Sequence, residues 1–518
     1  MKFKQLALVI GIAALLLYSC DSSGPGPGSS LLSDNVTVGV DGMMSVTSMS
    51  KWPANINFSY VQASSSIPAQ RNLSMEKLRA AGGKLKLKDH PSAAKFNANP
   101  PAFNKLNKAR SLMSEPPVYS LGDSRDFWIE NNLNPGNFIP FTAKLREIRE
   151  SCMIWVADGD YTGLSTKIAE MADMFDDIYP KETNLLGYEY GGGPSGDGGI
   201  DGEKRIQILV YDINDGIDTS TEGTILGYFW AKDEFYQDEL DDAFLFNKLK
   251  SNEAEIFYID SEYFKIEPDT IYSTLIHEFQ HMIHFNQKAI IRNQLSDTWY
   301  NEMLSQLAED VIGPMVGIDI DSPGHVINER IPLFLDVYDW LGLEDWDGGF
   351  SYSISYAFGA FLLRNFGGPV LMKEMLSNNK VDHDSVTAAL QTINSGYSFN
   401  YALERYAEAL IYSHSAKSPY GLPAGKCSFD KTTSNVIGGK TYTAKAFDIW
   451  EIECYWPGDR DDWKDYSGYY WLKKTGPWIW RMRNNFTIYS HSVSLQHNQF
   501  GKRMNVTGDY AWLRAYGN

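Results

Sequence analysis

Positive charge is scarce in this chain of 518 residues. The chain contains 46 lysines and arginines against 65 aspartates and glutamates, which gives a formal net charge of −19. Because no basic cluster offsets that excess, the chain would repel phosphate, and nucleic acid is excluded as a partner. The sequence also lacks a G-x-S-x-G elbow, a Walker loop and a dinucleotide fingerprint in a credible context. No internal repeat is evident, and the apolar content suffices for one large domain or two to three modest ones.

Long apolar runs are scarce as well. The run near the N-terminus, from Leu6 to Tyr18, follows two lysines and is shorter than the roughly 20 residues that a bilayer-spanning helix requires. It therefore predicts a cleaved export signal over residues 1–20. The sequence of residues 17–20, LYSC, resembles a bacterial lipobox with tyrosine in place of the usual small residue. This resemblance implies a lipidated Cys20 and an anchor in the bacterial cell envelope, at the outer membrane or cell surface. An ordinary secretory signal is the alternative.

Histidines are few, yet three of the nine lie in one stretch, residues 268–290. Apolar residues recur there at three- and four-residue steps after a proline, which predicts a helix with a buried face. The stretch contains the pattern H-E-x-x-H, in which His277 and His281 are four residues apart, so both imidazoles can hold one Zn²⁺. Glu278 lies beside the two histidines but is not on the row of the helix face that carries the two ligands. A carboxylate there can take a proton from zinc-bound water, whose pKa falls to about 7, and pass it to a leaving amine.

A purely structural helix is the alternative interpretation of this pattern. With so few histidines, a chance match is expected on the order of once in a hundred such chains. The histidines also have apolar neighbours, so the helix is mostly buried and its polar groups need partners. His284 lies seven residues after His277, a rise of about 10.5 Å, and therefore cannot be the third ligand. The metzincin pattern fails too, because His284 and Gln287 stand where that pattern requires glycine and histidine.

A second helix is predicted from about 297 to 310, and its Glu302 follows His281 by 21 positions. An H-E-x-x-H pattern followed by W-x-N-E on the next helix is similar to the gluzincin metallopeptidases. The run WYNEMLSQLAEDVIG looks most like the hyicolysin-type, M30-like bacterial family, and the likeness covers residues 120–415. The resemblance implies that Glu302 is the third zinc ligand. Glu309 is its competitor, and a solvated carboxylate near a helix N-terminus is the structural alternative.

The resemblance also raises the question of supporting residues. In the better-known thermolysin pattern an acidic residue supports the metal ligands one turn after the ligand glutamate, whereas Gln306 stands there in this sequence. Glu309 and Asp310 are the nearest acids that can replace it. In gluzincins a tyrosine or histidine of the helical lobe polarises the scissile carbonyl. The resemblance implies Tyr356 in that role, with Tyr352 one turn away as its rival, and a tyrosine that only fills the core is the alternative.

The order of predicted elements indicates the fold class. Strands are predicted at 206–211, 227–230 and 255–259, ahead of the H-E-x-x-H helix, and helices dominate from there to about residue 413. This order predicts an α+β fold with a twisted-sheet lobe, the H-E-x-x-H helix and a mainly helical lobe, as in a gluzincin. We expect this catalytic region to span residues 118–415. A peptide substrate can bind as an added strand at the sheet edge beside the metal.

The regions on either side are predicted to be different. Residues 21–117 begin as a Gly/Pro/Ser tether, continue with a few strand-like pieces and become rich in lysine, which indicates a solvated linker or a propeptide. Residues 421–518 predict a small β-domain with strands at 436–442, 446–454 and 485–494. Half of the 14 tryptophans lie in that part of the sequence. Clustered tryptophans more often form the core of a small β-domain than a docking face for a substrate, so we expect a core role here.

Two further expectations concern ions and cross-links. A Gly/Asp-rich loop at 190–202 and the segment 212–218 offer oxygen atoms for Ca²⁺, although turn formation explains both equally well. Cys427 and Cys454 can form a disulfide in an oxidising compartment, which would leave Cys152 free.

Together these patterns predict an exported, lipid-anchored zinc metallopeptidase that cleaves protein or peptide substrates, most simply as an endopeptidase. The alternative is a lipid-anchored surface adhesin or binding protein that keeps a metallopeptidase fold and uses its aromatic tail. Bound zinc with chelator-sensitive cleavage distinguishes the first from the second.

Overall fold

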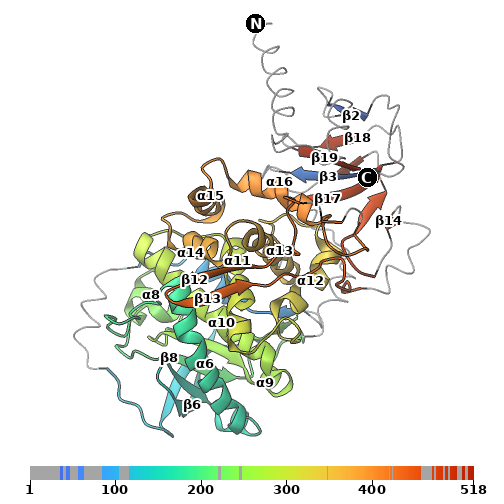
Figure 1. Ribbon diagram of the computed structural model, residues 1–518. Coiled ribbons are helices and arrows are strands. Elements are labelled where there is room, and N and C mark those ends of the chain that lie inside the picture. The colour runs from blue at the N-terminus through green and yellow to red at the C-terminus, as the bar shows by residue number, and fades with distance from the viewer. Residues whose placement is uncertain are drawn as a thin grey trace.

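Figure 1 shows the computed structural model of the chain. Backbone alone is described for several strands between residues 36 and 517. Side chains are described for residues 85–103, 116–219, 223–243, 248–346, 348–418, 421–422, 424–456, 474–478 and 491–495. The predicted export signal, Cys20 and the tether lie outside the described residues. Within the described part, no helix combines the length and the apolar character that a bilayer crossing requires.

A six-stranded sheet forms the first lobe, with the strand order β10-β11-β8-β7-β6-β5. The three strands β11, β8 and β7 run parallel, and every residue in them is buried. Such continuous apolar runs are typical of strands that are covered on both faces. The other three strands pair antiparallel at the two sides. The strands are β5 Ser124–Glu130, β6 Phe138–Ile148, β7 Cys152–Val156, β8 Ile206–Tyr211, β10 Gly227–Phe229 and β11 Ile256–Asp260.

The parallel strands lead directly to the H-E-x-x-H helix. Helix α6 (Ser165–Leu186) connects β7 to β8 and packs against β7 and α10. Strand β11 ends at Asp260, whose carboxylate caps the first turn of the short helix α9 (Ser261–Ile266). Helix α10 (Pro268–His284) follows at once, starts with its proline in the first turn, and continues as a π-helix over Phe285–Ile290. The predicted buried helix is thereby confirmed.

Helices α11 to α16 form the second lobe, in which α11 packs against both α10 and α13. Gly359 of α13 permits this close packing, because a Cβ atom there would lie 2.7 Å from Met303 and 3.0 Å from Leu307 of α11. The helices are α11 Thr298–Ile312, α12 Val326–Val337, α13 Gly349–Asn365, α14 Pro369–Ser377, α15 Asp382–Ile393 and α16 Phe399–Ala409. The predicted α+β fold, with a sheet lobe and a helical lobe, is confirmed.

The last part of the chain contributes to two different places. The hairpin of β12 (Thr433–Ile437) and β13 (Lys440–Ala444) packs on α11, α13 and α14 of the helical lobe. A separate five-stranded sheet has the order β14-β15-β17-β3-β19. In it β3 (Ile56–Gln62) lies between β17 (Val493–Asn498) and β19 (Ala511–Gly517), as Figure 1 shows. A strand from near the N-terminus therefore completes a sheet of the C-terminal tail.

Shorter strands complete this part of the molecule. A four-stranded sheet has the order β1-β2-β18-β16, and β14 and β15 extend the five-stranded sheet. Their bounds are β1 Val36–Val38, β2 Met43–Val46, β14 Tyr469–Trp471, β15 Ile479–Arg481, β16 Asn485–Thr487 and β18 Met504–Thr507.

The strand predicted at 446–454 is wrong. These residues form turns, apart from one isolated bridge between Glu453 and Thr475. Asp448 accepts a hydrogen bond of 3.0 Å from the backbone N–H of Trp450. An aspartate that binds the backbone two residues ahead stabilises a turn, and this local bond competes with strand pairing.

The disulfide that Cys427 and Cys454 could have formed is not present between these two described residues. The backbone N–H of Cys454 donates to the carbonyl of Lys474, 2.8 Å away. The charged groups that act on Cys427 are instead those around Glu408 at the end of α16. The two cysteines thus have different neighbours. Cys152 is also free and is fully buried in β7.

Candidate metal centre

Two buried helices bring together His277, His281 and Glu302, the helix cluster. The two histidine rings of α10 have their centroids 4.7 Å apart, and Glu302 faces them from α11. Nε2 of His277 lies 3.0 Å from Oε2 of Glu302, and Nε2 of His281 lies 3.5 Å from Oε1. Ligand atoms of a tetrahedral zinc ion with bonds of about 2.0–2.1 Å are roughly 3.3 Å apart. The donor set and its spacing therefore fit Zn²⁺.

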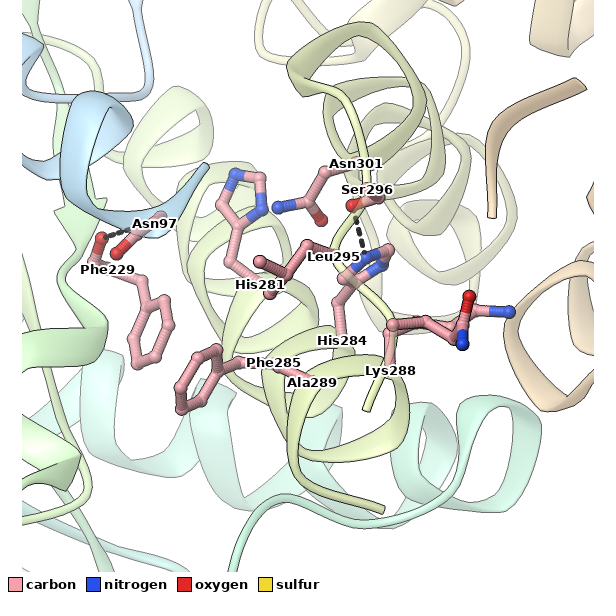
Figure 2. Close-up of a pocket in the computed structure, with 11 residues that line it drawn as sticks. Asn97, Phe229, His281, His284, Phe285, Lys288, Ala289, Leu295, Ser296 and Asn301 are labelled. Atoms are coloured by element: carbon pink, nitrogen blue, oxygen red, sulfur yellow. Dashed lines mark hydrogen bonds between the residues drawn. The ribbon is translucent and has the colours of Figure 1, made fainter. Parts of the chain in front are cut away.

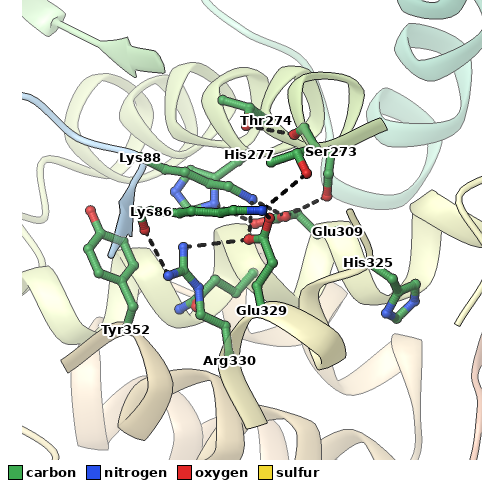
Figure 3. Close-up of polar contacts among 12 residues, drawn as sticks. Lys86, Lys88, Ser273, Thr274, His277, Glu309, His325, Glu329, Arg330 and Tyr352 are labelled. Carbon is green, nitrogen blue, oxygen red and sulfur yellow. Dashed lines mark hydrogen bonds and ion pairs between the residues drawn. The ribbon is translucent and has the colours of Figure 1, made fainter. Parts of the chain in front are cut away.

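The second nitrogen of His277 is held by Glu309. Oε1 of Glu309 lies 2.7 Å from Nδ1 of His277, and Oε2 accepts hydrogen bonds from Ser273, at 2.5 Å, and from Lys88 (Figure 3). Burial alone would raise the pKa of Glu309, but Lys88 and His277 hold it below its usual range. The ionised carboxylate fixes the imidazole with its proton on Nδ1 and leaves Nε2 free for a metal. Glu309 thus lies at the opposite edge of the ring from Glu302.

Residues of α11 orient the rest of the helix cluster. The hydroxyl oxygen of Ser305 lies 3.1 Å from Nδ1 and 3.4 Å from Nε2 of His281, and Nε2 of that ring lies 3.5 Å from Oε1 of Glu302. Gln306 donates to the main-chain carbonyl of Glu302 at 3.1 Å and to the hydroxyl of Ser355 on α13 at 3.2 Å. Gln306 therefore joins two helices. In the thermolysin pattern an acidic residue at this position supports the metal ligands, and here Glu309 provides that support.

Glu278 is fully buried beside the helix cluster. Neither of its carboxylate oxygens has a hydrogen-bond partner among the described residues. Burial raises the pKa of Glu278 well above its usual range, and the carboxylates of Asp89 and Glu302 raise it further. An unpartnered buried carboxylate is costly in a purely structural role. A carboxyl group with a raised pKa is suited to proton transfer.

The two candidate tyrosines of α13 have different surroundings. The ring of Tyr352 packs near His277, with centroids 6.4 Å apart. The charges that act most strongly on Tyr356 are those of Asp310 and Arg364, a buried ion pair with an N–O distance of 2.7 Å. Four residues of helix shift a side chain by about 6 Å along the axis, which is enough to carry Tyr356 away from the ligands. The structure thus places Tyr352, and not Tyr356, beside the helix cluster.

A pocket opens beside His281 (Figure 2). His284 also borders it, but Nε2 of His284 lies 2.9 Å from the hydroxyl of Ser296 rather than near the other ligands. Burial lowers the pKa of His284 well below its usual value and keeps the ring neutral. His284 thus lies outside the convergent group of His277, His281 and Glu302. Other residues that line the pocket are Asn97, Phe229, Phe285, Leu295 and Asn301.

The glycine-rich loop 190–202 is folded around a glutamate. A Cβ atom at Gly199 would lie 1.9 Å from Oε1 of Glu255, and the N–H of Ile200 donates to the same oxygen at 2.8 Å. In the described parts of the chain, no convergent group of His, Cys, Asp and Glu includes this loop or the segment 212–218. The contacts with Glu255 fit the interpretation of this loop as a series of turns.

Segment 85–103 takes part in the site, which the sequence analysis missed. Lys88 is fully buried against Glu309, and Asp89 is close enough to raise the pKa values of Glu278 and of Tyr352. A solvated linker is therefore the wrong interpretation for these residues. Lysine-rich composition usually indicates exposure, so only the location of the buried acids could have revealed the contact.

Comparisons with known proteins agree with this geometry. A sequence model of the family described as Peptidase M30 matches residues 150–432, more than half of the chain, and that range contains the whole helix cluster. The chain is also similar to the neutral metalloprotease ShpI of Staphylococcus hyicus, with 27% identity over 295 residues. The alignment covers 54% of this chain and 59% of the relative, so the chain spans about three fifths of the relative's length.

Proposed function

Since the chain belongs to the peptidase M30 family, we propose that it is a zinc endopeptidase that hydrolyses peptide bonds in proteins. In this proposal His277, His281 and Glu302 bind the ion, and Glu278 acts first as general base and then as general acid. The observation that carries the proposal is the buried Glu278 carboxylate, unpartnered within the described residues, beside a donor set that fits zinc.

The reaction adds water across the scissile C–N bond. Zinc in the helix cluster would supply a Lewis acid that lowers the pKa of water to about 7. Glu278 takes the proton from the attacking water and delivers it to the leaving amine. The hydroxyl of Tyr352 would donate a hydrogen bond that stabilises the negative charge on the carbonyl oxygen. The resemblance had implied Tyr356 in this role.

The substrate would bind as an extended peptide. Strand β10 lies at an end of the six-stranded sheet and is preceded by β9 (Thr224–Ile225), so its outer edge can accept an added strand. The pocket beside His281 would then receive the side chain next to the scissile bond. Its lining combines the apolar Phe229, Phe285 and Leu295 with polar side chains that include Asn97, Lys288 and Asn301.

The replacement of Glu278 by Gln tests the proposal. Gln keeps the size of the side chain but cannot accept the proton, so kcat should fall about 10²-fold or more while zinc stays bound. Glu234→Gln is a matched control, because Glu234 is also fully buried with both oxygens unpartnered in the described structure. The measurements are peptide hydrolysis and metal content. Near-normal turnover in Glu278→Gln would remove this residue from the mechanism, and ligand binding without metal-dependent cleavage would favour the adhesin alternative.

We also propose that the protein is exported and anchored in the bacterial cell envelope through a lipid on Cys20. The support is the apolar run that ends in the lipobox-like residues 17–20. A single acyl chain binds membranes only weakly, so stable anchoring requires more than one. We expect Cys20→Ser to abolish incorporation of labelled fatty acid and to release the protein from the membrane fraction. Unchanged labelling of that variant would contradict the anchor.

A further inference from the structure

Three side chains from distant parts of the sequence meet where the helical lobe adjoins the five-stranded sheet. They are Glu344 after α12, His383 in the first turn of α15, and His491 just before β17, together the junction cluster. Nε2 of His383 lies 2.8 Å from Oε1 of Glu344, and Nδ1 of His491 lies 3.2 Å from Oε2. The donor atoms of all three residues lie within 4.8 Å of one another.

Aromatic packing holds both imidazoles in place. His383 stacks on Phe399 with ring centroids 3.9 Å apart, and His491 meets the edge of the same ring at 5.3 Å. His491 is only 6% exposed. Nε2 of His383 and Nδ1 of His491 are both shielded from solvent, and each faces one carboxylate oxygen of Glu344. Two imidazoles that are held by packing and one carboxylate thus converge on one point.

We propose that Glu344, His383 and His491 form a second metal site, which binds a divalent transition-metal ion such as Zn²⁺. Two imidazoles and a carboxylate are ligands that zinc accepts, and separations of 2.8 and 3.2 Å are close to the roughly 3.3 Å of a tetrahedral site. Burial alone would raise the pKa of Glu344, but the two imidazoles lower it to about 2, so the carboxylate stays ionised.

An ion at the junction cluster would act as a cross-link. It would tie His491, next to strand β17, to two positions of the helical lobe that are far away in sequence. The ring of His383 also packs against Trp299, with centroids 5.3 Å apart. Trp299 lies in the first turn of α11, one turn before Glu302, so the cross-link would also support the helix that carries the third ligand of the helix cluster.

Metal counting on the full chain tests the second site. After saturation with zinc and removal of loosely bound ions, we expect two equivalents in the wild type and one in Glu302→Ala, by elemental analysis. Glu344→Gln should lose one equivalent, and the double variant should hold none. His414→Ala is the control, because His414 is an exposed histidine that also pairs with an acid, Asp430, and it should keep both equivalents.

The same experiment separates the two sites. One equivalent in the wild type and none in Glu302→Ala would overturn the junction site. One equivalent in both, lost in Glu344→Gln, would support the junction site and remove zinc from the helix cluster instead. A measurement that needs no further variant is the unfolding temperature of Glu302→Ala, which zinc should raise through the junction cluster. No shift on addition of zinc would count against the site.

A separate observation concerns segment 85–103, which runs across the helix cluster. Strand β4 (Lys86–Leu87) pairs in parallel with β9, and the carbonyl of Leu87 accepts a hydrogen bond of 2.8 Å from Leu226. The place proposed for an added substrate strand is thus taken by the chain itself. Further along, helix α3 (Pro91–Asn97) reaches the pocket, where the amide of Asn97 donates to the carbonyl of Phe229 at 2.8 Å (Figure 2).

Charged contacts hold the segment between these two anchors. Lys86 pairs with Glu267 at 2.8 Å, and its main-chain carbonyl accepts a bond of 2.8 Å from Arg330 (Figure 3). Lys88 reaches Glu309 behind His277. Because burial excludes water from the Lys88 contact, this pair is screened less by salt than a surface pair would be.

We infer that segment 85–103 keeps the protein latent by occupying the substrate cleft, with Asp89 beside the helix cluster. This inference rests on the proposed function. Lys88, the neighbour of Asp89 in the chain, contacts Glu309, whose Oε1 lies 2.7 Å from Nδ1 of His277, so the segment passes directly beside the helix cluster. Substrate would have to displace both the β4–β9 pairing and the Asn97 contact before it could bind.

The combined variant Asp89→Ala and Asn97→Ala of the full chain tests latency. We expect kcat/KM on a quenched peptide to rise about tenfold, and a peptide hydroxamate, which binds zinc directly, to bind more tightly by a similar factor. Lys95→Ala, at an exposed position of the same helix α3, should change neither quantity. Unchanged or weaker hydroxamate binding would overturn the inference whether or not the protein is a peptidase. Tighter hydroxamate binding without cleavage would instead count against the proposed function.

Discussion

The helix cluster and the junction cluster contain the same kinds of ligand but are held in different ways. In the helix cluster, Glu309 contacts the ring nitrogen of His277 that points away from the ligand atoms, Ser305 lies against both ring nitrogens of His281, and every member is 5% exposed or less. In the junction cluster, stacking on Phe399 holds the rings, and the side chains of Glu344 and His383 are 27% and 30% exposed. Both clusters therefore fix position, but only the helix cluster is seen to fix proton placement as well.

That difference separates two uses of a bound ion. Hydrogen bonds to the far nitrogen set the tautomer and raise the basicity of a ligand, which tunes the ion and the water on it. Stacking confers position alone, and position is all that a cross-link between two parts of a chain requires. The helix cluster also has a free carboxylate, Glu278, directly beside it. The following predictions test this comparison, from the largest expected effect to the smallest.

The replacement of Glu302 by Ala should have the largest effect. It removes a buried ligand from a set of three, so the helix cluster should lose its zinc at neutral pH and hydrolysis should fall to background. Elemental analysis should show one zinc equivalent fewer than in the wild type. Full zinc in Glu302→Ala, with a loss in Glu309→Ala instead, would reverse the roles of these two glutamates.

The replacement of Tyr352 by Phe should lower kcat by about 10²-fold, the typical cost of one donor to a developing oxyanion. Tyr356→Phe should have a much smaller effect on kcat, because the neighbours of Tyr356 are Asp310 and Arg364. Steady-state kinetics of the two variants at equal zinc content make the comparison. A larger loss in Tyr356→Phe would restore the assignment that the family resemblance implies.

The replacement of Glu309 by Ala should weaken zinc binding at the helix cluster 10- to 100-fold, as is typical when a supporting partner of a metal ligand is lost. Phe399→Leu is the corresponding change at the junction cluster, and we expect it to weaken zinc there less. Competition with a chelator of known affinity measures both values. Equal losses would mean that stacking and hydrogen bonding support a metal ligand equally well.

The sequence predicted the helix cluster because its two histidines are close in the chain. Four residues of helix place His277 above His281 whatever the rest of the chain does. Glu302 required the family resemblance, since nothing in the spacing alone decides between it and Glu309. The choice between Tyr352 and Tyr356 was open for a related reason. A pattern shows which residues share a helix, but packing against Asp310 and Arg364 decides which tyrosine reaches the site.

Contacts between segments that are distant in the sequence could not be predicted from the sequence. The junction cluster draws on three regions without a common period or motif, so no window of sequence contains it. Segment 85–103 was missed because lysines are usually exposed, whereas Lys88 is buried opposite Glu309. The order of strands and helices in the two lobes was predictable, since continuous apolar runs and helical periodicity are local properties.

Strand β3 determines when the molecule can be completed. It lies between β17 and β19, so its two partners are made only after almost the entire chain. At about 5–20 residues per second, synthesis leaves this strand without those partners for tens of seconds, and unpaired strand edges promote aggregation. Contacts between such distant residues also slow folding. The five-stranded sheet is therefore expected to close late, and loss of β19 would expose an edge of β3.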